Sequence, residues 1–101
     1  EQGMYTIEFA ECVKEHFKSL NSYQRTDIIN SIQTQLVHEP LTETRNRKAL
    51  RPNPIAPWEL RIGDLRVFYE ISAEEPDIVC VLAVGRKKGN QLFIGGKVVK
   101  L

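Results

Sequence analysis

Residues 58–71 constrain the fold more than any other part of the sequence. Two runs of alternating apolar and polar residues flank Gly63-Asp64, a dipeptide of the kind that closes a two-residue β-hairpin. A turn there places Arg61 directly opposite Arg66. Because side chains alternate across a strand, the hairpin has two chemically different faces. The expected core face carries Trp58, Leu60, Ile62, Leu65, Val67, Tyr69 and Ile71, and the other face carries Glu59, Arg61, Arg66, Phe68 and Glu70.

The two opposed arginines have two possible explanations. Like charges directly opposite each other on a sheet repel, so the pair would destabilise the hairpin unless something offsets it. In one interpretation both guanidinium groups are solvated and lean toward Glu59 or Glu70. In the other they form a site for an anionic ligand, since guanidinium binds phosphate in a bidentate manner.

Length and composition indicate one soluble domain covering residues 1–101. No apolar run approaches the roughly 20 residues that span a bilayer, and the start has no signal-peptide pattern. A cytoplasmic location without a membrane partner is therefore expected. Cys12 and Cys80 are predicted to be reduced thiols, one on a helix and one in a core strand. If Met4 is the original start, residues 1–3 are a remnant of cloning.

The charge is unevenly distributed along the chain. Residues 1–44 hold three basic and seven acidic residues, whereas residues 45–101 hold eleven basic and six acidic ones. The cationic charge therefore lies in the half that contains the hairpin. Such asymmetry points to a polyanionic partner.

The first 40 residues predict a strand and two helices. Residues 4–9 are rich in strand formers, and from residue 10 to 20 apolar residues recur at helical spacing. Asn21 can cap a second helix that ends at Pro40. Its predicted buried stripe consists of Ile28, Ile29, Ile32 and Leu36. The two stripes of this helical hairpin would cover the apolar face of a sheet.

The remainder predicts an antiparallel meander of three to four strands, which gives an α+β fold. Residues 41–57 lack periodicity and are predicted to form an exposed basic loop. Residues 77–84 are continuously apolar, as in a central strand. A basic cluster follows at 86–88 between two glycines, then a short strand at 91–94, a turn at Gly95-Gly96 and a tail at 97–101.

Few other chemical sites are indicated. His16 and His38 lack metal ligands at suitable spacing, so neither a metal nor a cofactor is expected. A cationic set remains, formed by Arg61 and Arg66 on the hairpin, Arg86, Lys87 and Lys88 after the central strand, and Lys48 and Arg51 before the hairpin. In an antiparallel meander the 86–88 cluster is expected near Arg66. Phe68, on the cationic face, could stack on a base or cover an apolar group of a partner.

The sequence resembles the RelE/ParE superfamily of bacterial toxins from type II toxin–antitoxin modules, and the RelE-like branch in particular. The runs that carry the resemblance are Glu59-Leu-Arg-Ile-Gly-Asp-Leu-Arg-Val-Phe-Tyr-Glu-Ile71 and Val81-Leu-Ala-Val-Gly85 with its basic cluster. The resemblance covers essentially the whole chain. It implies a RelE-like fold and a toxin that is neutralised by a cognate antitoxin protein.

In the RelE branch, the resemblance implies metal-independent cleavage of mRNA on the ribosome, which inhibits translation. The RNA's own 2′-hydroxyl attacks the phosphate, and basic residues stabilise the charge that develops. By position, Arg66 matches the phosphate-binding hairpin arginine, while Lys87 and Arg61 match further basic positions. Glu59 is a possible general base. The expected RNA contacts are Lys48, Arg51, Phe68, Arg86, Lys88 and Phe93.

The sequence also departs from the RelE pattern. Pro57 and Glu59 stand where that branch often has lysines, and Phe93 stands where it often has a catalytic tyrosine. A phenyl ring cannot donate a proton. Two alternatives therefore stay open beside ribonuclease activity: ParE-like inhibition of DNA gyrase without chemistry, and a non-toxic chain that keeps only antitoxin binding.

Overall fold

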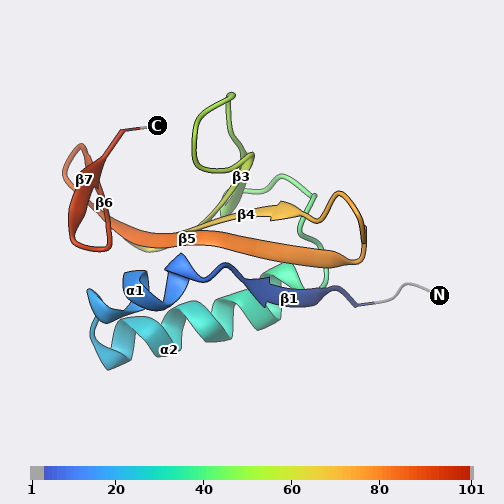
Figure 1. The fold of residues 1–101 in the computed structure, drawn as a ribbon, viewed down its shortest axis with the longest axis horizontal. Helices are drawn as coiled ribbons and strands as arrows, with labels where there is room; N and C mark the ends of the chain where they lie inside the picture. Colours follow the sequence, from blue (N-terminus) through green and yellow to red (C-terminus); the bar gives the residue numbers. More distant parts are fainter. Residues whose placement is uncertain (1–3, 101) are drawn as a thin grey trace.

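The computed structural model describes residues 4–100 and has the α+β architecture expected from the sequence (Figure 1). Strand β1 precedes two helices and a π-helical turn, and six more strands follow. The elements are β1 (Thr6–Phe9), α1 (Cys12–Lys18), α2 (Ser22–Ser31), η1 (Ile32–Leu36), β2 (Arg47–Ala49), β3 (Trp58–Ile62), β4 (Leu65–Ile71), β5 (Ile78–Lys88), β6 (Gln91–Ile94) and β7 (Lys97–Val99). No helix in this part of the chain is long and apolar enough to cross a membrane.

All strands belong to one sheet, with the long strand β5 at its centre. The antiparallel order is β2-β3-β4-β5-β6-β7, and β1 pairs with β5 in parallel. One edge of β5 pairs with β4, while its other edge pairs first with β1 and then with β6. The helices lie together on one side of this sheet, as Figure 1 shows.

The hairpin register predicted from the Gly63-Asp64 turn is confirmed. Trp58 pairs with Tyr69, and Arg61 pairs with Arg66. Gly63 has a φ of 60°, a left-handed conformation that the turn requires and that glycine adopts without strain. The turn chemistry therefore sets which side chains share a face of the sheet.

The predicted helical hairpin is also confirmed, including the start of its second helix. The Asn21 side chain accepts a hydrogen bond from the backbone N–H of Gln24 at 2.7 Å, and the Gln24 side chain accepts one from the backbone N–H of Asn21 at 3.0 Å. This reciprocal capping box satisfies two N–H groups that a helix start leaves free. Of the predicted stripe, Ile28, Ile32 and Leu36 are fully buried.

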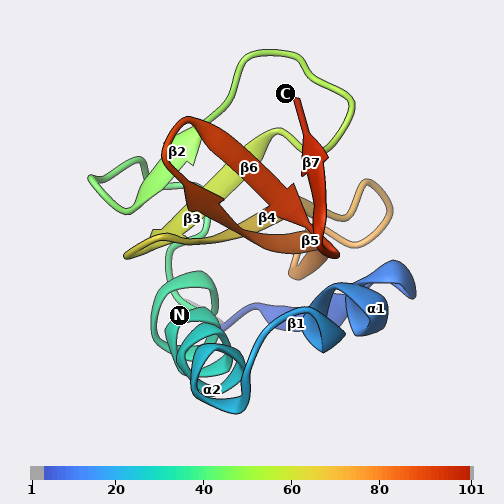
Figure 2. The ribbon, with the colours of Figure 1, turned by 90° about the vertical axis from the view of Figure 1, so that its left-hand side faces the viewer.

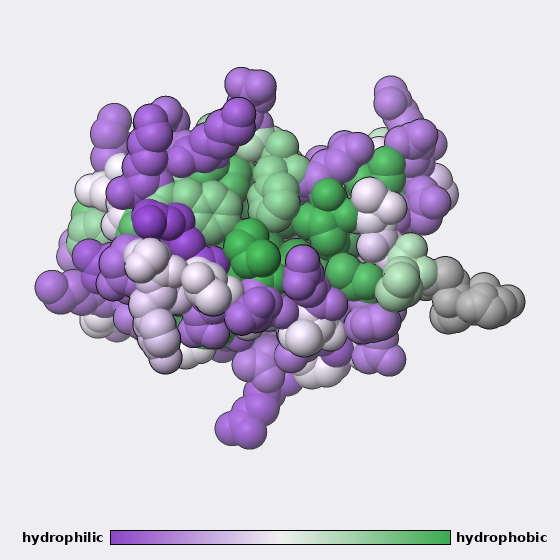
Figure 3. Space-filling model, turned by 90° about the horizontal axis from the view of Figure 1, so that it is seen from below, coloured by the Kyte–Doolittle hydropathy of each residue, from purple (hydrophilic) through white to green (hydrophobic). Residues whose placement is uncertain are grey.

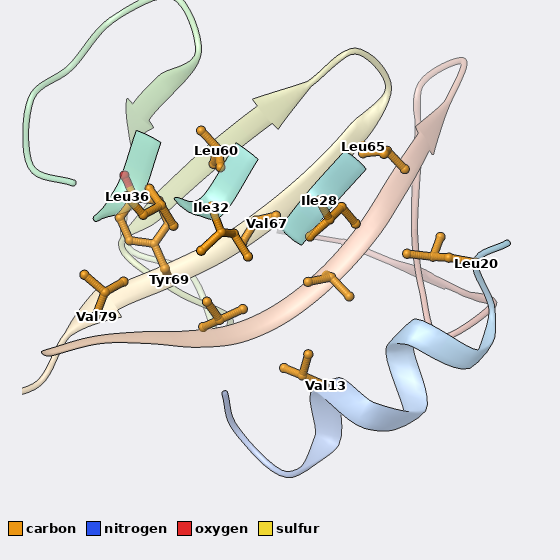
Figure 4. Packing of buried hydrophobic residues seen from close by; sticks show 12 residues of the cluster. Val13, Leu20, Ile28, Ile32, Leu36, Leu60, Leu65, Val67, Tyr69 and Val79 are labelled. Atoms are coloured by element: carbon orange, nitrogen blue, oxygen red, sulfur yellow. The ribbon is translucent and has the colours of Figure 1, made fainter. Parts of the chain in front are cut away.

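The main core lies between the helices and the sheet (Figure 4). Its buried members come from both helices and from strands β3, β4 and β5: Val13, Leu20, Ile28, Ile32, Leu36, Leu60, Leu65, Val67, Tyr69, Val79, Val81 and Val84. The Tyr69 hydroxyl donates a hydrogen bond to the Pro40 carbonyl at 2.6 Å. Burial raises the pKa of Tyr69 above its ordinary value.

A second, smaller core covers part of the opposite face of the sheet. It contains Ala56, Phe68, Ala83, Leu92 and Ile94. Figure 2 shows β6 and β7 on the side of the sheet away from the helices, with the loop that precedes β3 nearby. The hairpin's second face is therefore only partly open to water. Phe68 is fully buried, so the prediction that its ring stacks on a base or covers an apolar group of a partner is wrong.

Three segments are more regular than predicted. Residues 47–49 of the predicted loop form β2 on the edge of β3, and residues 97–99 of the predicted tail form β7, whereas Leu101 lies outside the described residues. Strand β5 does not end at Val84 but continues to Lys88. Gly85 does not break the strand. It makes room for β6, because a Cβ there would lie 2.2 Å from the Phe93 carbonyl oxygen.

Candidate anion-binding groove

A groove of about 390 Å³ lies where β3 meets the β5–β6 hairpin and β7. We call it the Glu59 groove, because Glu59 supplies its one carboxylate. Its wall combines lysines, amides and aliphatic side chains: Glu59, Lys87, Asn90, Gln91, Leu92, Val98, Val99 and Lys100. Such a mixture of apolar surface with a few charged groups is typical of ligand sites.

Glu59 is a buried carboxylate held between two arginines. Only 5 % of the residue is exposed. Its Oε1 lies 3.0 Å from Nε of Arg61, and its Oε2 lies 3.5 Å from Nε of Arg66. The interpretation in which the opposed arginines lean toward a carboxylate on their own face is therefore confirmed for Glu59, whose charge offsets their repulsion, although Arg66 is not solvated. The ligand-site interpretation stays a prediction.

Arg66 is more buried than the sequence suggested and is incompletely hydrogen-bonded. Its side chain is 12 % exposed. Its Nη1 donates to the carbonyls of Gly63 and Leu65 at 2.8 and 2.9 Å, but its buried Nε has no hydrogen-bond acceptor among the described residues. Burial lowers the pKa of Arg66, and the nearby Glu59 carboxylate opposes that shift. The expectation of an exposed Arg66 side chain is wrong.

Lys87 reaches the same groove from β5. Arg66 pairs with Gly85 across β4 and β5, so strand alternation puts Lys87 on the Arg66 face of the sheet. The Lys87 backbone N–H donates to the Asp64 carbonyl at 2.7 Å, which ties β5 to the tip of the hairpin. Lys87 therefore has a fixed position in the wall of the groove.

The other half of the basic cluster faces away from the groove. Arg86 pairs with Leu65, a main-core residue, and with Phe93 in β6. The Arg86 guanidinium carbon lies 5.7 Å from the centre of the Phe93 ring, a cation–π distance. By alternation Lys88 shares the face of Arg86. The structure thus brings Lys87 to Arg66 but does not bring Arg86, Lys88 or Phe93 there.

The two cations that precede the hairpin also separate. Lys48 in β2 pairs directly with Glu59, so it borders the arginine pair on the same face. Arg51 is exposed and lines a shallow hollow of the preceding loop together with Leu50, Pro52 and Asn53. Of the ten residues expected at the site, five therefore lie in or beside the Glu59 groove: Lys48, Glu59, Arg61, Arg66 and Lys87.

Sequence reasoning missed the far wall of the groove, which is formed by Asn90, Gln91, Leu92, Val98, Val99 and Lys100. A signal for it was present. Gly89-Asn90 is a two-residue hairpin turn between two strands, and Gly89 has a φ of 64°. Treating the 85–89 stretch as a loop concealed this hairpin and its contribution to the groove.

The groove can attract an anion but offers little proton-transfer machinery. Lys87 and Lys100 line the groove, and Arg61 and Arg66 contact its one carboxylate, that of Glu59. Local charge therefore favours phosphate. No group of three or more His, Cys, Asp or Glu side chains within residues 4–100 is arranged to hold a metal ion.

A second surface feature lies on the helix side of the molecule. A hollow of about 220 Å³ between β1 and α2 is lined by Ile7, Phe9, Ile29, Ile32 and Gln33. Figure 3 shows apolar side chains gathered along the middle of this side and bordered by hydrophilic ones. Phe9 is 45 % exposed and packs edge-on against Phe17. An exposed apolar strip of this kind is a candidate contact surface.

Comparisons with known proteins agree with this architecture. The crystal structure of the RelBE2 toxin–antitoxin complex from Mycobacterium tuberculosis contains a chain with the same fold, at a TM-score of 0.71 and 24% sequence identity, over 86% of this chain and 95% of that one. No curated protein matches the sequence. A family model described as ParE toxin of type II toxin-antitoxin system, parDE, matches residues 7–90. The chain therefore belongs to the ParE toxin family of type II toxin–antitoxin systems.

Proposed function

We propose that this toxin inhibits translation by cutting mRNA on the ribosome without a metal ion. One observation carries the proposal: Lys87 of β5 lines the Glu59 groove, and Arg61 of β3 and Arg66 of β4 contact the carboxylate of Glu59 in its wall. Three cations around one groove suit a phosphodiester, because guanidinium and ammonium groups form charge-assisted hydrogen bonds with phosphate oxygens.

The chemistry proposed for this site is mainly charge stabilisation. The 2′-hydroxyl of the RNA attacks the adjacent phosphorus, the 5′-oxygen of the next nucleotide leaves, and a cyclic phosphate results. Arg66 and Lys87 would stabilise the negative charge that develops on phosphorus. Glu59 is the one carboxylate in the groove wall that can accept the hydroxyl proton. Phe93 lies on the opposite face of the sheet and has no proton to donate, so the leaving 5′-oxygen takes its proton from water and slow cleavage is expected.

A translating extract tests this proposal. Added toxin should produce new mRNA 5′ ends at ribosome-dependent positions, and the double variant Arg61→Gln/Lys87→Gln should produce none. The control Lys14→Gln/Arg45→Gln removes two exposed cations outside the groove and should cut like the wild type. Full-length mRNA at every dose of folded wild-type toxin would contradict the proposal.

A second candidate function is inhibition of DNA gyrase by binding. The match to the ParE family model favours it, and so does Glu59, which neutralises part of the cation cluster that cleavage would use. A supercoiling assay separates the two functions. Loss of supercoiling at toxin doses that leave mRNA intact would support gyrase inhibition and rule out the ribonuclease as the main activity.

We further propose that the hollow between β1 and α2 receives a segment of the cognate antitoxin. The hollow is apolar and the chain carries a net charge of +1, concentrated in its second half, so an amphipathic segment with acidic flanks fits best. Co-expression of the neighbouring gene should restore growth of cells that make the toxin. The Phe9→Asp variant should stay toxic but escape this rescue, whereas Tyr23→Asp, at another exposed ring, should be rescued.

A further inference from the structure

We propose that Glu59 is a built-in counter-ion that orients the arginines of the groove and limits how tightly the groove binds phosphate. The proposal concerns a positioning residue and assigns it two opposing effects. It rests on the proposed function only in taking an RNA phosphate as the ligand.

The first effect is orientation. Each carboxylate oxygen of Glu59 faces a different guanidinium group, Oε1 toward Arg61 and Oε2 toward Arg66. The carboxylate is buried and lies on the middle strand of the β2–β3–β4 arrangement, paired with Lys48 on one side and Phe68 on the other. It is therefore fixed, and it holds two side chains that would otherwise repel each other.

The second effect is competition. Glu59 also lines the groove, so its negative charge lies beside any phosphate that Lys87 and Lys100 attract. Phosphate and carboxylate would then share the same two arginines. The Nε of Arg66 lies 3.5 Å from Oε2 of Glu59 without a well-aligned hydrogen bond among residues 4–100, so Glu59 holds Arg66 less firmly than Arg61, whose Nε donates to Oε1 at 3.0 Å. A neutral side chain at this position should remove the repulsion and release donors to the ligand.

The test is a gain of affinity. Glu59→Gln keeps the shape of the side chain and a carbonyl oxygen for Arg61, but removes the charge. It should bind a labelled single-stranded RNA about three- to tenfold more tightly than the wild type, the effect of one like charge a few ångströms away in a wet site. Glu70→Gln is the matched control, because Glu70 lies on the same face of the hairpin as Glu59. Glu70 takes part in none of the ion pairs found in residues 4–100. Its affinity should change less than twofold.

Equal or weaker RNA binding by a folded Glu59→Gln protein would overturn the proposal. A purely structural role for Glu59 predicts weaker binding or none, so only the counter-ion role predicts a gain. Folding of each variant is checked by circular dichroism at the temperature of the titration.

If Glu59→Gln does not fold, a measurement on the wild-type chain tests the proposal instead. Pyrophosphate is titrated while the side-chain Nε–H signals of the arginines and the carboxyl carbon of Glu59 are followed by NMR. The signals of Arg61, Arg66 and Glu59 should move together and saturate, while Arg47, which lies on the helix side of the sheet, should not move. Stationary Arg61, Arg66 and Glu59 signals up to about millimolar pyrophosphate would refute the proposal.

The outcomes remain distinguishable from failure of the proposed function. Tighter RNA binding by Glu59→Gln, with no cleavage by either protein, supports the counter-ion and contradicts the ribonuclease. Cleavage by the wild type, with no gain of affinity in the variant, supports the ribonuclease and contradicts the counter-ion.

Discussion

Each face of the sheet carries a buried arginine, but the two arginines differ in their hydrogen bonds. On the helix side, the side chain of Arg47 is 7 % exposed; its Nε donates to the Thr42 carbonyl at 2.9 Å, and its two Nη groups reach Gln35 and Glu39. On the groove side, Arg66 is 12 % exposed, and its Nε has no hydrogen-bond acceptor among the described residues.

Both arginines support the fold, but only Arg66 contacts a residue of the groove wall. A buried polar group without a partner costs stability, so a protein generally retains one only where another requirement outweighs the cost. The helix side joins the end of the helical hairpin to β2 through Arg47. On the groove side, Arg66 contacts Glu59, whose carboxylate lines the concave surface.

On the groove side of the sheet, the second core is expected to contribute to the stability of the fold. Phe68→Ala should lower the free energy of unfolding by about 3–5 kcal/mol, because the ring is fully buried in the second core. Urea denaturation followed by circular dichroism measures this. Tyr23→Ala, at a ring that is 81 % exposed, should cost less than about 0.5 kcal/mol. If both substitutions lower the free energy of unfolding by a similarly small amount, Phe68 lies on an open surface and the second core does not exist.

The two buried arginines should respond differently to removal of their charge. Arg47→Met should cost about 2 kcal/mol of stability, because it leaves the Thr42 carbonyl and the Gln35 side chain without a donor, and should leave RNA affinity unchanged. Arg66→Met should cost at least as much stability, because it removes the donor to two backbone carbonyls and one partner of the buried Glu59, and should also reduce RNA affinity about tenfold. Paired urea and RNA titrations of both variants provide the comparison. Equal effects of the two substitutions on RNA binding would remove the distinction between the faces.

Charge reversal at Arg66 does not isolate binding from folding. It would place a second carboxylate next to the buried Glu59, and two adjacent buried carboxylates repel. A sequence that suggests an exposed arginine predicts little loss of stability from Arg66→Glu, whereas the structure predicts a large one. Neutral substitutions at this position are therefore the informative ones.

The protein should lose stability at alkaline pH because of Tyr69, which is buried in the main core on the helix side of the sheet. Burial raises the pKa of this hydroxyl in the folded chain above the value of 10.0 expected when unfolded. Above pH 10 the unfolded chain loses the proton while the folded chain keeps it, so stability should fall as pH rises, by at most about 1.4 kcal/mol per pH unit. Urea unfolding between pH 9 and 11 should show a shallower loss for Tyr69→Phe than for wild type. Tyr23→Phe should follow the wild type, and identical slopes for all three proteins would contradict this assignment.

Sequence reasoning succeeded where local rules determine the structure. A two-residue turn fixes the pairing of Arg61 with Arg66, and a capping box fixes the start of α2 at Asn21. Both features depend on residues within a few positions of each other. The alternation that follows from the turn then orders every side chain of the hairpin.

Predictions from the sequence failed where contacts between distant segments determine the structure. Strand β2 has only three residues and no alternating pattern, and it forms because the edge of β3 is available. Phe68 is buried because residues 50–56 and strands β6 and β7 pack over it. These segments are distant in sequence, so no local pattern predicts the contact. Gly85 suggested the end of a strand, but it serves the close approach of β6, and this error placed Arg86 and Lys87 on a loop instead of on opposite faces of β5.

The affinity of two neighbouring variants for single-stranded RNA tests the central claim most directly, namely that strand alternation gathers the phosphate-binding cations in the Glu59 groove. Lys87→Gln should weaken binding about threefold and reduce the slope of log affinity against log salt by about 0.7, the loss of one phosphate contact on a single strand. Arg86→Gln, one residue earlier but on the opposite face, should leave both quantities nearly unchanged. Equal losses for the two variants, or a larger loss for Arg86→Gln, would contradict the account.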